Sequence, residues 1–229
     1  MRPGPGTPAT TVPSAAEVPA SPTVPGWTLV PAVAAPVAMI GGWTLAQAQQ
    51  PSFDAVLETI SALAATDAVA PWIMTAGLAV TGLAHVATAA GLRPVPRAGR
   101  LLHALGGAAT VAVAALPVDV HPTAHGIAAA VGFGALALWP SCAWRRGATG
   151  VLRPAVAVGA SAALVGLLVL FVLELQGLTP DGGAATGLTE RLVAGAQALG
   201  PLAVVVALRR GQRRESEART ATRSALPRR

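Results

Sequence analysis

Six long apolar runs, separated by short polar segments, make up most of this 229-residue chain. A helix needs about 20 apolar residues to cross the roughly 30 Å hydrocarbon core of a bilayer, and each run approaches or exceeds that length. The pattern therefore predicts an all-α fold, an integral membrane bundle of six transmembrane helices. The predicted spans are residues 27–46, 71–92, 100–116, 123–144, 154–176 and 188–208.

The segment between the first two runs, residues 51–70, has a different pattern. Apolar side chains recur there at helical spacing, while polar side chains share another face. A helix of this kind lies in the plane of the membrane surface. The segment is therefore predicted to be a short amphipathic interfacial helix, and Asp67 is predicted to cap the second span. The apolar set is Phe53, Val56, Leu57, Ile60 and Leu63, and the polar set is Asp54, Glu58 and Ser61.

Both ends of the chain are predicted to be disordered tails around a transmembrane domain at residues 27–208. Residues 1–26 are mostly Pro, Thr, Ala, Ser and Gly, and residues 209–229 are basic and polar. Neither segment carries enough apolar surface to offset the entropy lost on ordering. Ala46-Gln47-Ala48 matches the small-residue pattern of signal-peptide cleavage, but the run before it is longer than a signal peptide's apolar region. That run is therefore interpreted as the first span.

The arginines predict the orientation of the bundle. All sixteen basic residues are Arg, and six spans place every one except Arg191 on the side of the two termini. An excess of Lys and Arg marks the cytoplasmic side of a membrane protein. The N- and C-termini are therefore predicted to be cytoplasmic, and the protein to lie in the inner (plasma) membrane of the cell.

Composition supports the membrane class and limits the partners. Only 11% of the residues are charged, whereas about a quarter are charged in soluble domains. The net charge of +6 does not indicate a nucleic-acid partner, because the arginines flank apolar runs without interleaved aromatic residues. The predicted partner is the lipid bilayer, with a lipid or small molecule as a possible ligand. The single cysteine, Cys142, excludes an intrachain disulfide, and the sequence leaves the oligomeric state open.

The candidate site consists of polar residues that the topology brings to the outer ends of the spans. An ionisable residue within a span is a functional hypothesis by default, because burying its charge in lipid is costly. Arg191, alone on that side, is expected to have a partner such as Glu174, Asp119 or a lipid phosphate. The cluster is predicted to bind a small polar ligand or a lipid headgroup. Its members are Ser61, Asp67, Asp119, His125, Glu190 and Arg191.

A metal site is an alternative use of the same region. His121 and His125 are four residues apart, a spacing that can place two imidazoles on one helical face, and Asp119 is close by. Zinc held by these three residues, with Glu190 or Asp67 as base, would suit a membrane-embedded lipid hydrolase. In the competing interpretation Asp119 and His121 are solvated and His125 binds a backbone carbonyl. No cofactor other than zinc is predicted.

His85 and His103 lie on the cytoplasmic side of the second and third spans and are close enough in topology to meet. Proton movement would need such a pair, but the sequence places no acid beside it. The pair is therefore interpreted as an interhelical hydrogen bond. A small transporter is a further alternative, although the spans supply almost no charged path across the membrane.

Four short motifs, in this order along the chain, resemble the bacterial six-transmembrane domain-of-unknown-function family number 998. They are Thr59-Ile60-Ser61-Ala62-Leu63 before the second span, Leu116-Pro117-Val118-Asp119 after the third, His125-Gly126 in the fourth, and Gly187-Leu188-Thr189-Glu190-Arg191-Leu192 opening the sixth. The resemblance covers residues 27–210. Members commonly carry Ile-Ser-Asp-Leu-Gly where this chain has Ala62 and Ala64 instead of the Asp and Gly. It implies a six-span membrane fold and no particular activity.

Overall fold

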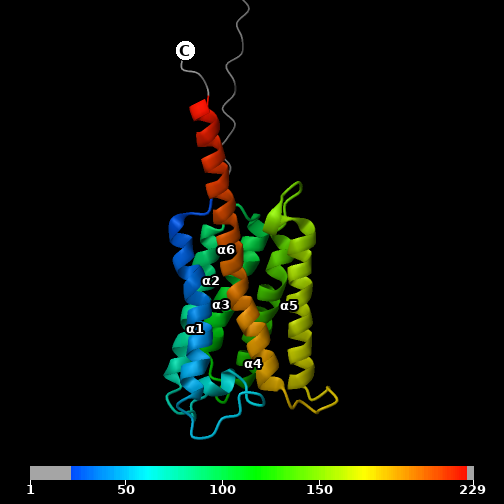
Figure 1. The fold of residues 1–229 in the computed structure, drawn as a ribbon. Helices are drawn as coiled ribbons and strands as arrows, with labels where there is room; N and C mark the ends of the chain where they lie inside the picture. The colour runs from blue at the N-terminus through cyan, green and yellow to red at the C-terminus, as the bar shows by residue number, and fades with distance from the viewer. Residues whose placement is uncertain (1–21, 226–229) are drawn as a thin grey trace, which may run out of the picture.

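The computed structural model describes residues 22–225, which form a bundle of six α-helices (Figure 1). The helices are α1 (Leu29–Gln47), α2 (Trp72–Gly91), α3 (Arg97–Ala115), α4 (Pro122–Leu138), α5 (Pro154–Leu175) and α6 (Thr186–Ala225). Short 3-10 helices are η1 (Gly26–Thr28), η2 (Ser61–Ala64), η3 (Trp139–Cys142) and η4 (Gly150–Leu152). Within the described residues all six α-helices are long and apolar enough to cross a membrane. The protein is thus an all-α, multi-pass membrane protein, as predicted.

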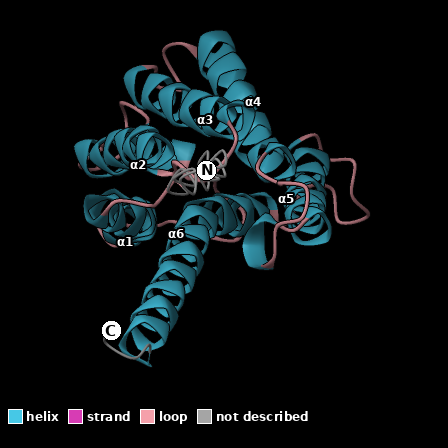
Figure 2. Ribbon diagram, turned by 90° about the horizontal axis from the view of Figure 1, so that it is seen from above, coloured by secondary structure: helices cyan, strands magenta, loops and turns pink. Residues whose placement is uncertain are grey.

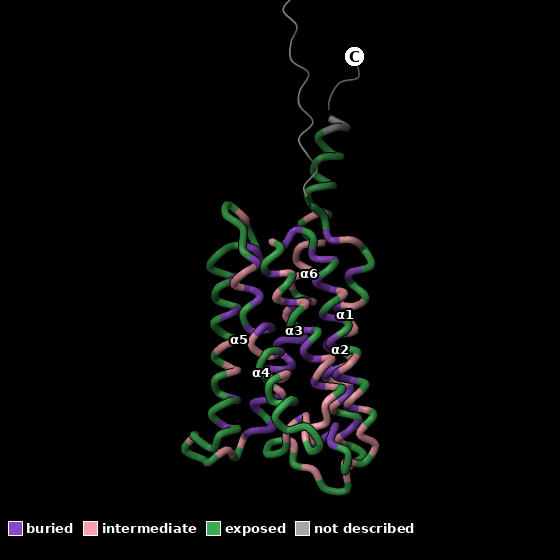
Figure 3. The backbone as a smooth tube through the Cα atoms, turned by 180° about the vertical axis from the view of Figure 1, so that it is seen from behind, coloured by how far each residue is buried: buried purple, intermediate pink, exposed green. Residues whose placement is uncertain are grey.

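The helices follow one another around the bundle, and α6 closes it by packing against both α1 and α5 (Figure 2). In the most apolar 18-residue stretch of α2, 50% of the residues are buried inside the protein. In the corresponding stretch of α5 only 17% are buried. Figure 3 shows the difference, with α5 exposed along most of its length. Because α5 is also the most apolar helix, this exposed surface is suited to lipid.

The helix pair α2–α3 is packed backbone to backbone. A Cβ on Gly82 would lie 2.5 Å from the carbonyl oxygen of Gly107, and a Cβ on Gly107 would lie 2.6 Å from that of Gly82. Small residues allow this approach where lipid offers no hydrophobic driving force. The contact fixes α2 against α3 beside His85. A Cβ on Gly107 would also lie 2.8 Å from the Cβ of His85.

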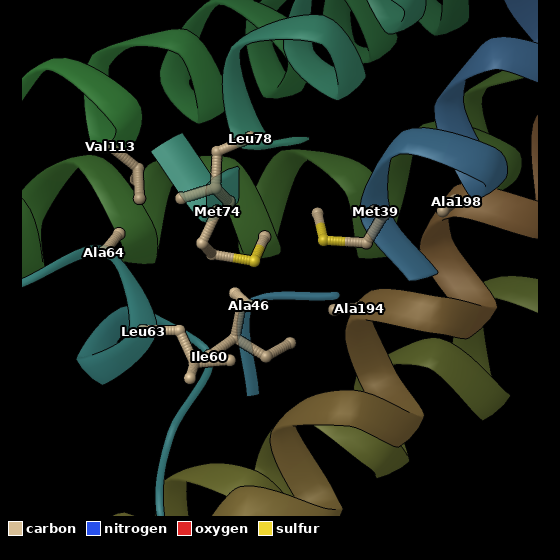
Figure 4. Packing of buried hydrophobic residues seen from close by; sticks show 10 residues of the cluster. All are labelled: Met39, Ala46, Ile60, Leu63, Ala64, Met74, Leu78, Val113, Ala194 and Ala198. Carbon is tan, nitrogen blue, oxygen red and sulfur yellow. The ribbon is translucent and has the colours of Figure 1, made fainter. Parts of the chain in front are cut away.

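Two hydrophobic clusters fill the bundle, one towards each end. Figure 4 shows one of them, in which Met39 of α1 and Met74 of α2 are directed into the same cluster as Ile60 and Leu63 of the α1–α2 loop. This loop is therefore part of the core. The second cluster comprises Val24, Ala32, Leu92, Val95, Leu136, Trp139, Ala143, Leu152 and Val205.

The amphipathic helix predicted for residues 51–70 is not confirmed. Only η2 is helical there, and the rest of the segment consists of turns. Asp54 Oδ1 accepts hydrogen bonds from Val56 N and Leu57 N, and Thr59 Oγ1 accepts one from Ala62 N. Such local side-chain bonds compete with helical hydrogen bonds, so the segment folds as a loop.

The two predicted tails also differ from the structure. Helix α6 runs on to Ala225, well beyond the predicted end at residue 208, and rises out of the bundle (Figure 1). Its extension, residues 209–225, contains six Arg, three Ala and two Glu, which have high helix propensity. At the other end, Val24 is only 4% exposed and belongs to the second cluster. Residues 1–21 of the predicted N-terminal tail lie outside the described residues.

The ends of the bundle differ in charge. The α2–α3 and α4–α5 loops, the start of α1 and the end of α6 lie together at the upper end in Figure 1, which we call the basic end. The other three loops lie at the opposite end, which we call the loop end. Among the described arginines only Arg191 is at the loop end. The cytoplasmic location of the basic end stays a prediction.

Candidate functional site

The α1–α2 loop is fastened to the first turns of α6, far away in the sequence. Leu188 N donates a hydrogen bond to Val56 O at 3.0 Å, and Ile60 N donates one to Glu190 Oε2 at 2.5 Å. The side chain of Glu190 is thereby held inside the bundle, where the residue is only 4% exposed.

Arg191 also joins the α1–α2 loop to α6, from a neighbouring face of the helix. Its Nη1 donates to the carbonyl oxygens of Ala55, Glu58 and Gly187 at 3.0, 2.9 and 2.9 Å. Its guanidinium also lies 5.5 Å from the centre of the Phe53 ring. No carboxylate forms an ion pair with it among the described residues, so neither Glu174 nor Asp119 is its partner, and a lipid phosphate stays a prediction. Backbone carbonyls of the loop take that place.

His125 joins α4 to η2 and to the end of α3. Its Nδ1 lies 2.6 Å from Leu116 O, and its Nε2 lies 3.0 Å from Ser61 Oγ. A carbonyl oxygen only accepts hydrogen bonds, so Nδ1 carries the proton and Nε2 accepts from the Ser61 hydroxyl. The ring is buried, and this geometry matches the interpretation in which His125 binds a backbone carbonyl.

The other polar residues of the predicted cluster lie at the surface of the loop end. Asp119 accepts hydrogen bonds from Thr66 N, at 3.1 Å, and from the Thr66 hydroxyl. The hydrogen bond from the Thr66 hydroxyl lowers the pKa of Asp119 below its ordinary value of 3.8. Asp67 and His121 are exposed. Asp67 does not cap α2, whose N-cap is Pro71 and has no side-chain hydrogen bond, so that prediction is wrong.

A cavity of about 50 Å³, partly open to the outside, lies between the helices on the inner side of this junction. Ser61 and Glu190 reach it from the loop end, and His85 reaches it from α2. Of the six predicted ligand-binding residues only these two, Ser61 and Glu190, line the cavity. Its full lining is Met39, Ile60, Ser61, Leu78, Thr81, His85, Thr110, Val113, Ala129, Gly132, Phe133, Leu136, Glu190, Ala194 and Gln197.

Most polar side chains of the cavity donate their hydrogen bonds to backbone carbonyl oxygens of the protein. Thr81 Oγ1 donates to Gly77 O at 2.7 Å, and Thr110 Oγ1 donates to Gly106 O at 2.9 Å. Gln197 Nε2 donates to Phe133 O at 2.9 Å. Within the described residues, Oε1 of Glu190 has no hydrogen-bond partner. The cavity therefore presents mainly acceptors, one of them a carboxylate.

At the far side of the cavity His85 meets His103, as predicted. His85 Nδ1 and His103 Nε2 are 3.0 Å apart, and the two residues are 1% and 0% exposed. The His103 ring also stacks on Trp139, with 4.7 Å between ring centroids and 17° between planes. The pair is thus buried, oriented and in contact with the cavity.

The proposed zinc ligands are not brought together. In the part of the chain that the structure describes, no three His, Cys, Asp or Glu residues are grouped so that they could hold one metal ion. Both ring nitrogens of His125 already have partners, and Asp119 is bonded to Thr66. The geometry lends no support to zinc held by Asp119, His121 and His125, and this remains a prediction from spacing alone.

Several contributors to the site were not predicted from the sequence. Gln197 is a polar residue in the apolar part of α6, and its 2% exposure shows that it turns inward; its isolation within a span was a usable signal. Thr81, Thr110 and Trp139 gave no such signal, because Thr and Trp are common in spans for reasons of packing.

The comparison with known families matches residues 32–222 to a family described as "Protein of unknown function (DUF998)". The chain belongs to the DUF998 family. The match includes all of α2 to α5 and most of α1 and α6, so the DUF998 region is the membrane bundle itself. No curated protein and no solved structure matches the chain. The function of this DUF998 protein therefore has to be argued from its own site.

Proposed function

We propose that this DUF998 protein binds a small cation or hydrogen-bond donor in its interior cavity, with Glu190 as the recognising group. The observation that carries the proposal is the carboxylate of Glu190, buried in the bundle with one oxygen unbonded on a cavity. A buried charge is costly unless it is paired. A bound cation would contact the carboxylate directly, whereas the Arg191 guanidinium donates its hydrogen bonds to carbonyl oxygens of the loop.

The size and lining of the cavity narrow the ligand. A water molecule needs roughly 10–15 Å³ of such volume, so about 50 Å³ admits a few waters or one compact organic cation. With acceptors from Glu190, Gln197 and the threonines around it, an ammonium group fits the chemistry. A lipid headgroup at the surface cluster is a weaker candidate, because Asp119 and both ring nitrogens of His125 are already bonded within the protein; of the Arg191 nitrogens, Nε and Nη2 have no hydrogen-bond partner among the described residues.

Small ammonium ions are expected to stabilise the detergent-solubilised protein against heat. A ligand at 100 times its Kd stabilises the folded state by about 2.7 kcal/mol. We expect methylammonium chloride to raise the Tm of the wild type relative to sodium chloride at equal ionic strength. The Glu190→Gln variant keeps an oxygen to accept from Ile60 N but loses the charge, so its Tm should not respond. Equal responses in the two proteins would contradict the proposal.

A second candidate function, ester hydrolysis, is favoured by the Ser61–His125 pair. The Ser61 hydroxyl donates to His125 Nε2, and Leu116 O fixes the opposite ring nitrogen, which is the arrangement of a nucleophile with its general base. In such a reaction Ser61 Oγ would attack the ester carbonyl while His125 takes the hydroxyl proton and passes it to the leaving alcohol. Water would then release the acid from Ser61. This hydrolase would need no metal.

A fluorophosphonate probe separates the two candidates. An activated Ser61 is expected to form a covalent adduct that mass spectrometry locates at residue 61, and Ser61→Ala should abolish it. His125→Gln, which can still bind Leu116 O, should slow labelling because it removes the base. If the wild type is not labelled at Ser61, hydrolysis is excluded and the ligand-binding proposal is untouched.

A further inference from the structure

We propose that the His85–His103 pair relays protons between the cavity and the basic end of the bundle. One nitrogen of each ring forms the hydrogen bond between them: His85 Nδ1 and His103 Nε2 are 3.0 Å apart. In the part of the chain that the structure describes, the second nitrogen of each ring has no hydrogen-bond partner: His85 Nε2 belongs to a residue that lines the cavity, and His103 Nδ1 is buried on the side away from His85. An imidazole can accept a proton at one nitrogen and release one from the other.

The transfer balances as one proton in and one proton out. A proton from the cavity binds His85 Nε2, the proton on His85 Nδ1 passes to His103 Nε2, and the proton on His103 Nδ1 leaves. Both rings then hold the opposite tautomer, and reorientation of the two rings restores the starting state, so that each cycle moves one proton. The stack of Trp139 against His103 keeps that ring in line with its partner.

Two buried hydroxyls lie on α2 and η1 towards the basic end. Within residues 22–225, Thr88 Oγ1 and Thr28 Oγ1 are both buried without a hydrogen-bond partner. Thr88 follows His85 by three residues on the same face of α2. A Cβ on Gly91, one further turn along, would lie 2.1 Å from Thr28 Oγ1. Buried polar atoms are nearly always bonded, and those without protein partners are sites for ordered water. Hydroxyls and water both accept and donate, as a proton path requires.

The cavity also supplies the acid that the sequence did not place beside the histidines. Glu190 and His85 are the titratable side chains of its lining, and they come from α6 and α2. From the other elements packed on the pair, α3 contributes His103 and η3 contributes the uncharged Trp139. Water in the cavity would carry the proton between Glu190 and His85. The relay shares this cavity with the proposed ligand but does not depend on ligand binding.

Proton flux through the full-length protein in liposomes tests the relay. The vesicles contain a pH-sensitive dye, and a potassium diffusion potential is applied. Wild-type vesicles are expected to acidify faster than protein-free vesicles when the inside is negative, and to alkalinise faster when the inside is positive. His85→Gln and His103→Gln keep a hydrogen-bonding side chain but cannot relay a proton, so flux should fall to the protein-free rate. His121→Gln changes an exposed histidine at the loop end and should keep the wild-type rate.

Thr88→Val is a second test variant, which keeps the relay testable if the histidine variants do not fold. The Thr88 hydroxyl is buried and unpaired, so its replacement by an isosteric methyl should not lower stability. The proposal nevertheless expects slower flux in this variant. Wild-type flux equal to that of protein-free vesicles would overturn the relay, and so would wild-type rates in both folded His103→Gln and Thr88→Val. Either result would leave methylammonium binding at Glu190 unaffected, which distinguishes the two proposals.

Discussion

Replacing Gly187 by alanine is expected to destabilise the protein by about 1–3 kcal/mol, the usual cost of overpacking. A Cβ at this position would lie 2.2 Å from the carbonyl oxygen of Glu58 and 2.8 Å from that of Ala55. These are backbone atoms, so the α1–α2 loop would have to move away from α6 as a unit. The move would break the bond from Ile60 N to Glu190, and methylammonium binding should weaken together with stability.

Gly211→Ala is the matched control for this experiment. Gly211 lies in the same helix, is not followed by proline, and a Cβ there would meet nothing within 4 Å. Its Tm should therefore equal or exceed that of the wild type, since Ala favours a helix over Gly. Thermal unfolding in detergent micelles measures both variants. A Gly187→Ala protein as stable as Gly211→Ala would show that the loop is not packed against α6 as described.

Arg191→Met is expected to cost at least about 1.5–3 kcal/mol, the range for one hydrogen bond that involves a charged group. The substitution removes all three bonds from Nη1, two of which hold the loop carbonyls of Ala55 and Glu58. Met retains much of the apolar volume of Arg, so the loss reports mainly on the hydrogen bonds.

The control for Arg191 is Arg146→Met, at the basic end. Arg146 is exposed, and substitution at such a surface position usually changes stability by less than about 0.5 kcal/mol. Denaturant or thermal unfolding of the two variants in one detergent gives the comparison. Similar stabilities for Arg191→Met and Arg146→Met would refute the role of Arg191 as a fastener of the loop.

The helices could be predicted because each span is encoded locally. A run of about 20 apolar residues is long enough to cross a bilayer whatever its neighbours do. The α1–α2 loop could not, because its conformation depends on partners such as Arg191 and Glu190 that lie on α6. Its apolar residues recur at helical spacing for another reason: Ile60 and Leu63 pack into the core from a turn.

The extension of α6 was missed for a different physical reason. Low hydrophobicity and high charge were interpreted as disorder, yet Arg, Glu, Gln and Ala propagate a helix that the membrane span has already nucleated. Nucleation is the costly step, so a polar segment attached to a stable helix can remain helical. Composition alone does not show this attachment.

The candidate site could be predicted as a neighbourhood but not as a set of contacts. The sequence placed Ser61, His125 and Glu190 near one end of the bundle. In the structure Ser61 is hydrogen-bonded to His125, and Glu190 lines the cavity. It could not show that Asp119 would bond Thr66, because that pairing depends on how two loops meet. Nor could it show that His85 shares a cavity with Glu190, which requires knowing how α2 faces α6.

The central claim is that the buried carboxylate of Glu190, and not another acid, recognises a small cation. Calorimetric titration of methylammonium into wild type, Glu190→Gln and Glu174→Gln tests it most directly. Glu174 is also buried, at 7% exposure, but its Oε2 accepts from Ala185 N and it does not line the cavity. We predict equal Kd values for wild type and Glu174→Gln, and no binding to Glu190→Gln. Unchanged binding in Glu190→Gln, or none in the wild type, would contradict the account.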